Sequence, residues 1–120
     1  MLAERMELLT KRPQGTLFPP AQNRAAWETL PANDRMDMET FIAKWRGTPY
    51  PMLLLSDYAA FVRTGSRAQC ETPYFARRRK LIAAVLDVCL HGESADLSPV
   101  EDGLWCICDE TTWAISAHPN

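Results

Sequence analysis

The sequence predicts an all-α fold in which helical hairpins pack side by side. Two observations support this: apolar residues recur at helical spacing along most of the chain, and proline and glycine stand where helices begin and end. No stretch shows the alternation expected of a strand. With 120 residues, of which 47% are hydrophobic, the chain is long enough for one small core and too short for two ordinary domains.

Residues 1–16 are expected to stand apart from the helical domain, which we assign to residues 17–120. A short opening helix should cover Leu2 to Leu9. The stretch from Lys11 to Pro20 contains three prolines and one glycine, so it should form an irregular arm.

Two helices are predicted next. Proline at the first helical position gives up only an amide that would be unpaired there, so Pro20 can begin one helix, and Pro31 should end it. From Asp37, apolar residues at positions i, i+3, i+4 and i+7 predict a second helix, which ends at Gly47. These apolar residues are Met38, Phe41, Ile42 and Trp45.

Residues 50–55 should form an extended, buried connection, because a residue that precedes proline avoids the helical conformation. Ser56 can cap the following helix, and Gly65 closes it. The inner face of this helix is expected to consist of Tyr58, Phe61 and Val62.

The longest helix is predicted to run from a cap at Thr72 to His91, with Gly92 as the residue that ends it. Arg78 falls within the apolar stripe of this helix, whereas its basic neighbours should point toward water. A guanidinium in that position needs a carboxylate, because an unpaired buried charge is costly. The candidate partners are Glu71, Glu101 and Glu110.

The final helix begins with a capping box made of Ser98 and Glu101, and it should continue to Asp109 or Glu110. Its inner face is expected to consist of Val100, Leu104, Ile107 and Cys108. The helices are joined by short turns, and no internal repeat of fixed period is present, so the pattern suits stacked helical hairpins.

A carboxylate, an indole and an imidazole follow the last helix at Glu110, Trp113 and His118. Such a set suits sugar binding, because an aromatic face stacks on a pyranose while polar groups bind its hydroxyls. Ordinary packing of Trp113 and an ion pair of Glu110 with an arginine would explain the same residues. His118 has no second ligand at metal-binding spacing, so no metal site is expected.

Composition excludes several classes of function. The net charge is -2, from 15 acidic and 13 basic residues spread along the chain, so neither nucleic acid nor an anionic membrane is an expected partner. No apolar run is long enough to span a bilayer, and the N-terminus lacks a secretory signal, so a cytoplasmic location is expected. The four cysteines should be reduced and mostly buried. No phosphate loop, nucleophile elbow or dinucleotide turn occurs, so no cofactor is expected.

An ordered series of motifs resembles the N-terminal helical region of heparinase II/III-type polysaccharide lyases. The resemblance covers about residues 17–120 and is carried by eight short segments or single residues. They are Leu55-Ser56-Asp57-Tyr58, Phe61, Arg63-Thr64-Gly65-Ser66-Arg67, Glu71, Tyr74-Phe75-Ala76-Arg77-Arg78-Arg79, Asp102-Gly103-Leu104-Trp105-Cys106-Ile107-Cys108-Asp109-Glu110, Trp113 and Ala117-His118.

This resemblance implies an incomplete (α/α) toroid whose hairpins ring a cleft for acidic polysaccharide. It also implies that the complete protein is a lyase acting by β-elimination, although the family's catalytic Asn, Tyr and His fall outside this chain. No catalytic residue is therefore assigned, and the chain should be inactive alone. Glu110, Trp113 and His118 are expected to line the cleft, and Arg67, Arg78 and Glu71 to form supporting ion pairs.

Two departures from the family pattern bear on these cleft contacts. Asp109 stands where a glutamate is more usual, and Pro119 interrupts the expected Pro-Ala-His-Asn stretch.

The alternative is a free-standing helical module that binds a protein partner through an apolar stripe. On the lyase interpretation, the exposed edge of the toroid should favour self-association or binding of the missing C-terminal part. The resemblance also implies that related proteins can be exported.

Overall fold

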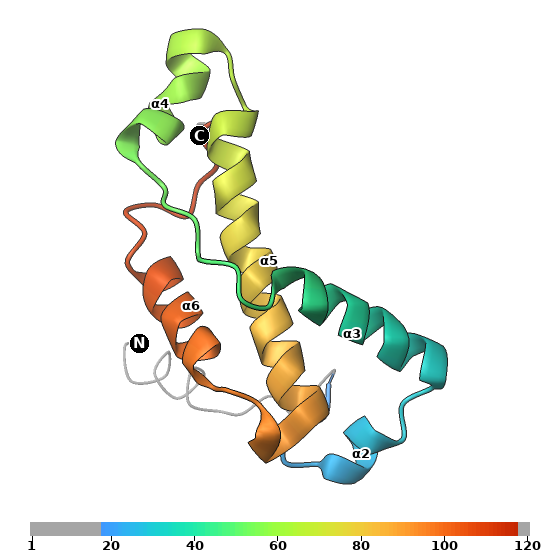
Figure 1. Ribbon diagram of the computed structural model, residues 1–120. Coiled ribbons are helices and arrows are strands. Elements are labelled where there is room, and N and C mark those ends of the chain that lie inside the picture. The colour runs from blue at the N-terminus through green and yellow to red at the C-terminus, as the bar shows by residue number, and fades with distance from the viewer. Residues whose placement is uncertain (1–17, 118–120) are drawn as a thin grey trace, which may run out of the picture.

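The computed structural model describes residues 18–117, and within them every regular element is a helix (Figure 1). The prediction of an all-α fold is therefore confirmed for this part of the chain. The opening helix and the arm assigned to residues 1–16 lie outside the described residues. The helices are α2 (Arg24–Glu28), α3 (Ala32–Trp45), α4 (Leu55–Thr64), α5 (Ala68–His91), a 3-10 turn η1 (Gly92–Ser94) and α6 (Ser98–Cys108).

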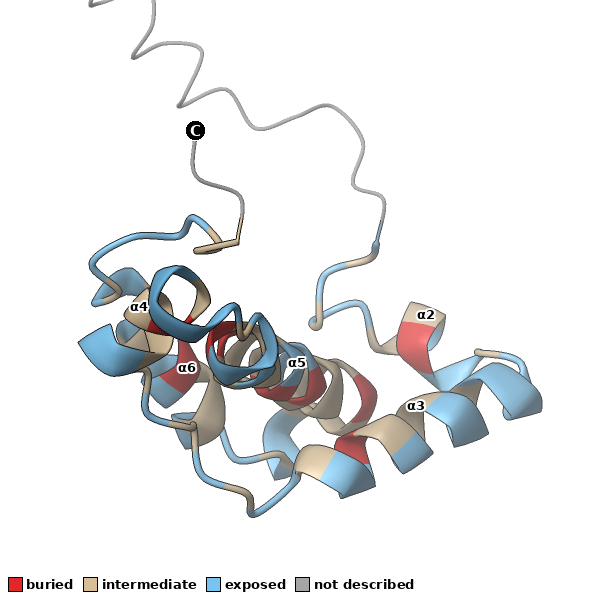
Figure 2. Ribbon diagram, turned by 90° about the horizontal axis from the view of Figure 1, so that it is seen from above, coloured by how far each residue is buried: buried red, intermediate tan, exposed pale blue. Residues whose placement is uncertain are grey.

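Helix α5 is the centre of the arrangement. Helices α4 and α6 lie along one side of α5, and α2 and α3 lie on the other side (Figures 1 and 2). Each of these four helices packs on α5, and α6 runs antiparallel to it after the short turn η1. The two sides of α5 therefore form separate packing regions that share one helix.

The hydrophobic core between α2, α3 and α5 is small. It consists of Trp27, Ile42 and Leu90, each at most 4% exposed, with four partly buried side chains around them. Those four are Leu30, Met38, Leu86 and Cys89. Arg24 closes the end of this core, because its guanidinium donates hydrogen bonds to the carbonyl oxygens of Cys89 and Leu90 at 2.8 and 2.9 Å. These bonds satisfy carbonyls that have no partner within the last turn of α5.

The predicted starts of α2, α3, α4 and α5 are wrong. Helix α4 begins at Leu55, so Ser56 lies inside it and is not its cap. Helix α2 begins at Arg24 rather than at Pro20, since the side chain of Asn23 accepts a hydrogen bond from the backbone N–H of Ala26. Helix α3 begins at Ala32 directly after Pro31, so the same proline that was expected to end one helix also precedes the next.

Helix α5 begins at Ala68, four residues before the predicted cap. The hydroxyl of Ser66 accepts a hydrogen bond from the N–H of Gln69, and Pro73 therefore lies inside the helix instead of at its first position. At the start of α6 the expected capping box is absent, and the carboxylate of Asp96 accepts from the N–H of Ser98 at 3.0 Å. That bond lowers the pKa of Asp96.

The helix ends agree better with the sequence. Gly65 and Gly92 follow α4 and α5 with φ of 76° and 60°, a region that favours glycine. The backbone N–H of each closes the last turn by donating to a carbonyl of the helix.

Several predicted inner faces are wrong. The connection before α4 is extended as predicted, but Met52 and Leu54 are 72% and 51% exposed, so it is not buried. In α4 the buried residue is Ala60, while Val62 is 83% exposed. In α6 the buried position is Gly103, while Leu104 and Cys108 are exposed. Helix α6 instead approaches its neighbours through the position that has no side chain.

Candidate functional site

A buried carboxylate joins α5 to the segment that follows α6. The side chain of Glu110 is 1% exposed and binds Arg78 with both oxygens, at 2.8 and 3.2 Å. Of the three carboxylates considered for Arg78, Glu110 is the one that pairs with it. Two parallel charge-assisted bonds fix the orientation of both groups, so the end of α6 is tied to the middle of α5.

Arg77 also contacts Glu110, which corrects the expectation that the neighbours of Arg78 point toward water. Its side chain is 12% exposed, and one guanidinium nitrogen lies 3.4 Å from a carboxylate oxygen of Glu110. Its Nε donates to the carbonyl oxygen of Pro51 at 2.7 Å, and the same nitrogen that contacts Glu110 lies 3.5 Å from the carbonyl oxygen of Cys106. Arg77 therefore links the connection before α4 to the end of α6.

Two tyrosine hydroxyls hold the segment after Glu110. Tyr58 donates to the carbonyl oxygen of Thr112 at 2.9 Å, and Tyr74 donates to that of Trp113 at 2.6 Å. The guanidinium carbon of Arg78 lies 3.4 Å from the centre of the Tyr74 ring, so this ring also covers the ion pair. Burial, followed by the nearby charge of Glu110, raises the pKa of Tyr58.

The predicted sugar-contacting residues differ in exposure. Trp113 is 63% exposed, and its indole N–H donates to the carbonyl oxygen of Ile107 at 2.9 Å. The carboxylate of Glu110 faces two arginines and almost no solvent, and a role of Glu110 in sugar binding stays a prediction. His118 lies outside the described residues. Of the two predicted sugar-contacting residues that the structure describes, Trp113 is thus the one with an exposed side chain.

Arg67 and Glu71, both expected in supporting ion pairs, contact each other at the start of α5. The two side chains are one helical turn apart, with 3.1 Å between Nε and Oε1, and they are 53% and 25% exposed. This contact is local to one helix. It does not link the segments that Arg78 and Glu110 bring together.

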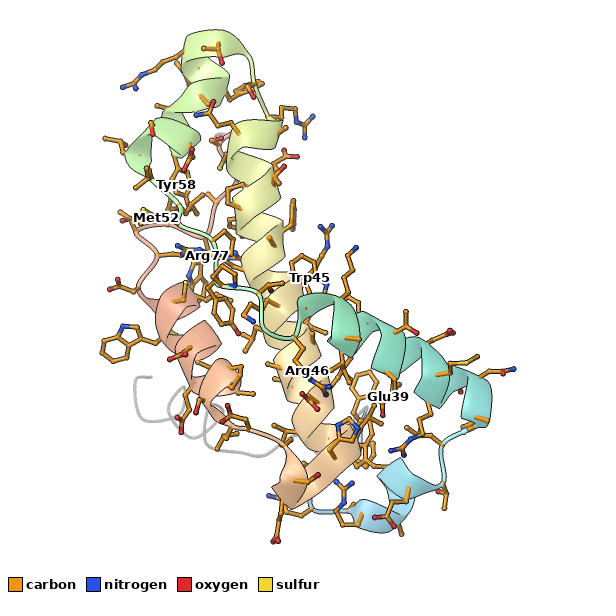
Figure 3. The ribbon with its side chains drawn as sticks, viewed as in Figure 1. Glu39, Trp45, Arg46, Met52, Tyr58 and Arg77 are labelled. Carbon is orange, nitrogen blue, oxygen red and sulfur yellow. The ribbon has the colours of Figure 1, made fainter. Side chains whose placement is uncertain are left out.

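A pocket of about 560 Å³ lies beside this centre. Figure 3 shows Tyr58 and Arg77 on the side of α5 that faces α4 and α6. The pocket walls combine aromatic rings with carboxylate, hydroxyl and guanidinium groups, which is a composition suited to a polar ligand with an apolar face. The lining includes Leu55, Tyr58, Arg77, Trp105, Asp109, Glu110, Thr111 and Thr112.

A second charged cluster lies on the opposite side of α5 and joins it to α3. His91 places Nδ1 2.6 Å from Asp87 and Nε2 2.8 Å from Glu39. Asp87 also binds Arg46 through two nitrogens, with the shortest contact at 3.0 Å. Burial lowers the pKa of His91, but the hydrogen bonds to Asp87 and Glu39 outweigh it, so the pKa is raised above 6.5.

This second cluster was not predicted from the sequence. Asp87 and His91 are four residues apart in α5, and that spacing places two side chains on one helical face. The spacing was available in the sequence, whereas the contact with Glu39 depends on how α3 crosses α5.

The four cysteines are free thiols in different environments. Cys70 is buried, and Cys89 and Cys106 are partly buried, but Cys108 is exposed, which corrects the expectation of burial for that residue. Burial raises the pKa of the Cys89 thiol. Within residues 18–117, no group of His, Cys, Asp and Glu side chains is arranged to hold a metal ion, and no helix is long and apolar enough to span a membrane.

Comparison of the sequence with protein-family models found no match, and comparison with curated proteins found none either.

Proposed function

We propose that this chain is the N-terminal helical part of a heparinase II/III-like polysaccharide lyase. In this proposal α2 to α6 form one arc of an (α/α) toroid, whose complete form binds acidic polysaccharide and cleaves it by β-elimination. The chain has no catalytic function alone, and it contributes one wall of the cleft.

The observation that carries the proposal is the meeting of separate motifs at Glu110. The segments that resemble the lyases lie far apart in the sequence, yet Tyr58, Arg78 and Trp113 from three of them converge within one network of hydrogen bonds and ion pairs. A set of motifs shared with an enzyme family is expected to have such a common structural purpose. The resemblance thus acquires a physical meaning that a helical pattern alone does not give it.

The pocket beside Glu110 supports a contact with sugars. Trp105 lines it and is 79% exposed, and Trp113, which follows the lining residue Thr112, is 63% exposed. Each indole can stack on the apolar face of a pyranose. Arg77 lines the pocket and supplies positive charge for an acidic sugar, although it also contacts Glu110, which binds Arg78 as well. We assign Glu110 the role of positioning these groups, and we place the sugar contacts on the exposed rings.

A titration of the isolated chain with acidic oligosaccharides tests this proposal. The indole N–H signals of the four tryptophans can be followed by NMR, with tetrasaccharides from heparin and alginate as probes and a neutral cello-oligosaccharide as control. The signals of Trp105 and Trp113 should shift, whereas those of Trp27 and Trp45, on the other side of α5, should stay in place. Shifts at Trp45 alone, or no shifts with either acidic probe, would overturn the proposed site.

Two further measurements separate binding from catalysis. Trp113→Ala should weaken binding of the acidic tetrasaccharides several-fold, while Val62→Ala, which also removes an exposed apolar side chain, should leave it unchanged. Absorbance of unsaturated uronate should not rise when the chain is mixed with either polymer. Clear turnover would contradict the assignment of catalysis to other parts of the lyase.

A second candidate function, a helical protein-binding module, is favoured by one observation. A groove of about 700 Å³ between the N-terminal end of the described chain, α5 and α6 is lined almost entirely by apolar side chains, among them Phe18, Ile82, Val85 and Leu97. These four are 42% to 73% exposed. Other apolar residues at helical spacing are less available to a partner, since Ile42 of α3 and Tyr74 of α5 are buried.

Sedimentation of the isolated chain tests this second function. Concentration-dependent association that Val85→Glu abolishes, in a chain that binds no acidic oligosaccharide, would favour the module over the lyase part. A chain that stays monomeric and binds the acidic tetrasaccharides would favour the lyase part.

A further inference from the structure

A pocket of about 630 Å³ lies between the end of α3, the second half of α5, the connection to α6 and the first turn of α6. Figure 3 labels Trp45 and Arg46, which line this pocket at the end of α3. Its walls are apolar at Ile42 and Ala83 and carry cationic groups at Arg46 and Lys80. It is therefore a mixed cavity in which an apolar floor meets positive charge.

Lys80 is the exceptional residue of this pocket, because it is a buried cation without a carboxylate. It is 7% exposed, and no carboxylate oxygen of the described residues lies within 4.0 Å of its Nζ. Nζ donates to the carbonyl oxygen of Trp45 at 3.2 Å and lies 5.0 Å from the centre of the Tyr50 ring. An ammonium group has three N–H donors, so the carbonyl and the ring leave both donor capacity and net charge uncompensated.

The acidic residues near the pocket do not compensate Lys80. Asp87 is held by Arg46 at 3.0 Å and by His91 at 2.6 Å. Asp96 lies in the connection to α6, where it is exposed and accepts a hydrogen bond from the N–H of Ser98. Arg78 differs from Lys80, because its guanidinium donates two hydrogen bonds to the buried carboxylate of Glu110.

We infer that this pocket binds a small organic carboxylate, with Lys80 as the counter-ion of its carboxylate group. The carboxylate of the ligand would accept hydrogen bonds from the N–H groups of Lys80 that do not contact Trp45. The apolar part of the ligand would lie against Ile42, Ala83 and Pro99. A single negative charge matches the single uncompensated ammonium, and the apolar walls favour an organic anion over a fully hydrated inorganic one. This site is separate from the proposed sugar-contacting surface, because the two pockets share no lining residue.

Benzoate and benzamide form a matched pair of probes for the wild-type chain, because they have nearly the same shape and differ in charge. Backbone NMR signals of Ala83 and Ala84 should shift with benzoate and saturate at millimolar concentrations, while benzamide should cause little change. Equal responses to the two probes, or no saturable response to benzoate, would overturn the inference. A response to inorganic phosphate as strong as that to benzoate would also contradict it, because the apolar walls would then have no role.

Substitution of Lys80 tests the assigned counter-ion. Lys80→Met keeps the length of the side chain, and it should weaken benzoate binding about ten-fold or more because a charge-assisted hydrogen bond is lost. Arg79→Met is the matched control, since it removes one positive charge from the next residue of α5, which is exposed. Unchanged binding in Lys80→Met, or an equal loss in Arg79→Met, would contradict the role of Lys80. If Lys80→Met does not fold, the comparison of benzoate with benzamide on the wild-type chain decides the question.

Discussion

The two sides of α5 use similar charged residues in opposite ways. Toward α6, the carboxylate of Glu110 is 1% exposed and the side chain of Arg77 is 12% exposed. Toward α3, the acidic and basic groups form a longer chain, but Arg46 is 59% exposed and Glu39 is 38% exposed. Water already solvates the second set, so its ion pairs gain little, whereas the first set depends on its internal partners. Burial, not the number of ion pairs, therefore decides which set of charges is more costly to break.

The largest effect is expected from removing the buried negative charge. Glu110→Gln keeps the shape of the side chain but leaves Arg77 and Arg78 without a counter-charge, and it should lower the free energy of unfolding by about 3 kcal/mol or more. Urea unfolding followed by circular dichroism measures this loss. Glu101→Gln, at an exposed position of α6, serves as control and should change stability by less than about 0.5 kcal/mol. Similar losses in the two variants would show that the burial of Glu110 does not set the size of the effect.

The next largest effect on stability is expected at Gly103, where α6 packs closely against Tyr50 and Leu81. A Cβ atom at Gly103 would clash with the hydroxyl of Tyr50 and lie 2.8 Å from Cδ1 of Leu81. Alanine stabilises a helix relative to glycine by about 1 kcal/mol, but overpacking here should make Gly103→Ala destabilising by about 2 kcal/mol. Thermal unfolding checks the sign, with the exposed Asp102→Ala as control. A stabilised Gly103→Ala variant would show that α6 packs less closely on α5 than described.

The sequence predicted features that depend on neighbouring residues in the chain. Gly65 and Gly92 end their helices as expected, because a left-handed residue after a helix is a local requirement. The position of Arg78 in an apolar stripe correctly indicated that it needs a carboxylate. The choice of Glu110 could not be predicted, since it depends on where the segment after α6 returns to α5.

The missed features have a common physical cause. Helix α5 packs on both of its sides, so a stripe defined by one apolar face assigned Arg77 and Lys80 to solvent when both are largely buried. Long cationic side chains can reach partners across such a helix, which a hydrophobic period does not show. The start of α2 was missed because the side chain of Asn23 caps it, whereas α6 begins at Ser98, where the sequence placed its cap.

A smaller, pH-dependent effect is expected on the α3 side. Both ring nitrogens of His91 face carboxylates, of Asp87 and Glu39, and only the protonated imidazole can donate to both. Because the pKa of His91 is raised above 6.5 in the folded chain, its contribution is complete below pH 6.5 and is lost as the pH rises through the folded pKa. Arg35 and Arg46 pair with the same two carboxylates, and they keep their charge throughout this window.

Urea unfolding at a series of pH values measures this dependence. The wild-type chain should lose about 1 kcal/mol relative to His91→Gln between slightly acidic and alkaline pH. An unchanged difference between the two chains across the series would show that the contacts of His91 with Asp87 and Glu39 do not stabilise the fold.

The smallest effect is expected at the outer end of the same cluster. Arg35 and Glu39 lie 3.9 Å apart with side chains that are 37% and 38% exposed. Arg35→Ala should therefore change the free energy of unfolding by less than about 0.5 kcal/mol, and added salt should reduce even that. A loss as large as that of Glu110→Gln would show that the exposed cluster acts as a unit.

The account rests on the claim that Arg78 and Glu110 form one energetic unit that joins the separate motifs. A double-mutant cycle with Arg78→Met, Glu110→Gln and the combined variant measures this coupling directly by urea unfolding. The account predicts that the double variant is more stable than the sum of the single losses implies, with a coupling free energy of at least about 2 kcal/mol. A coupling below about 0.5 kcal/mol, as found for exposed pairs, would contradict it.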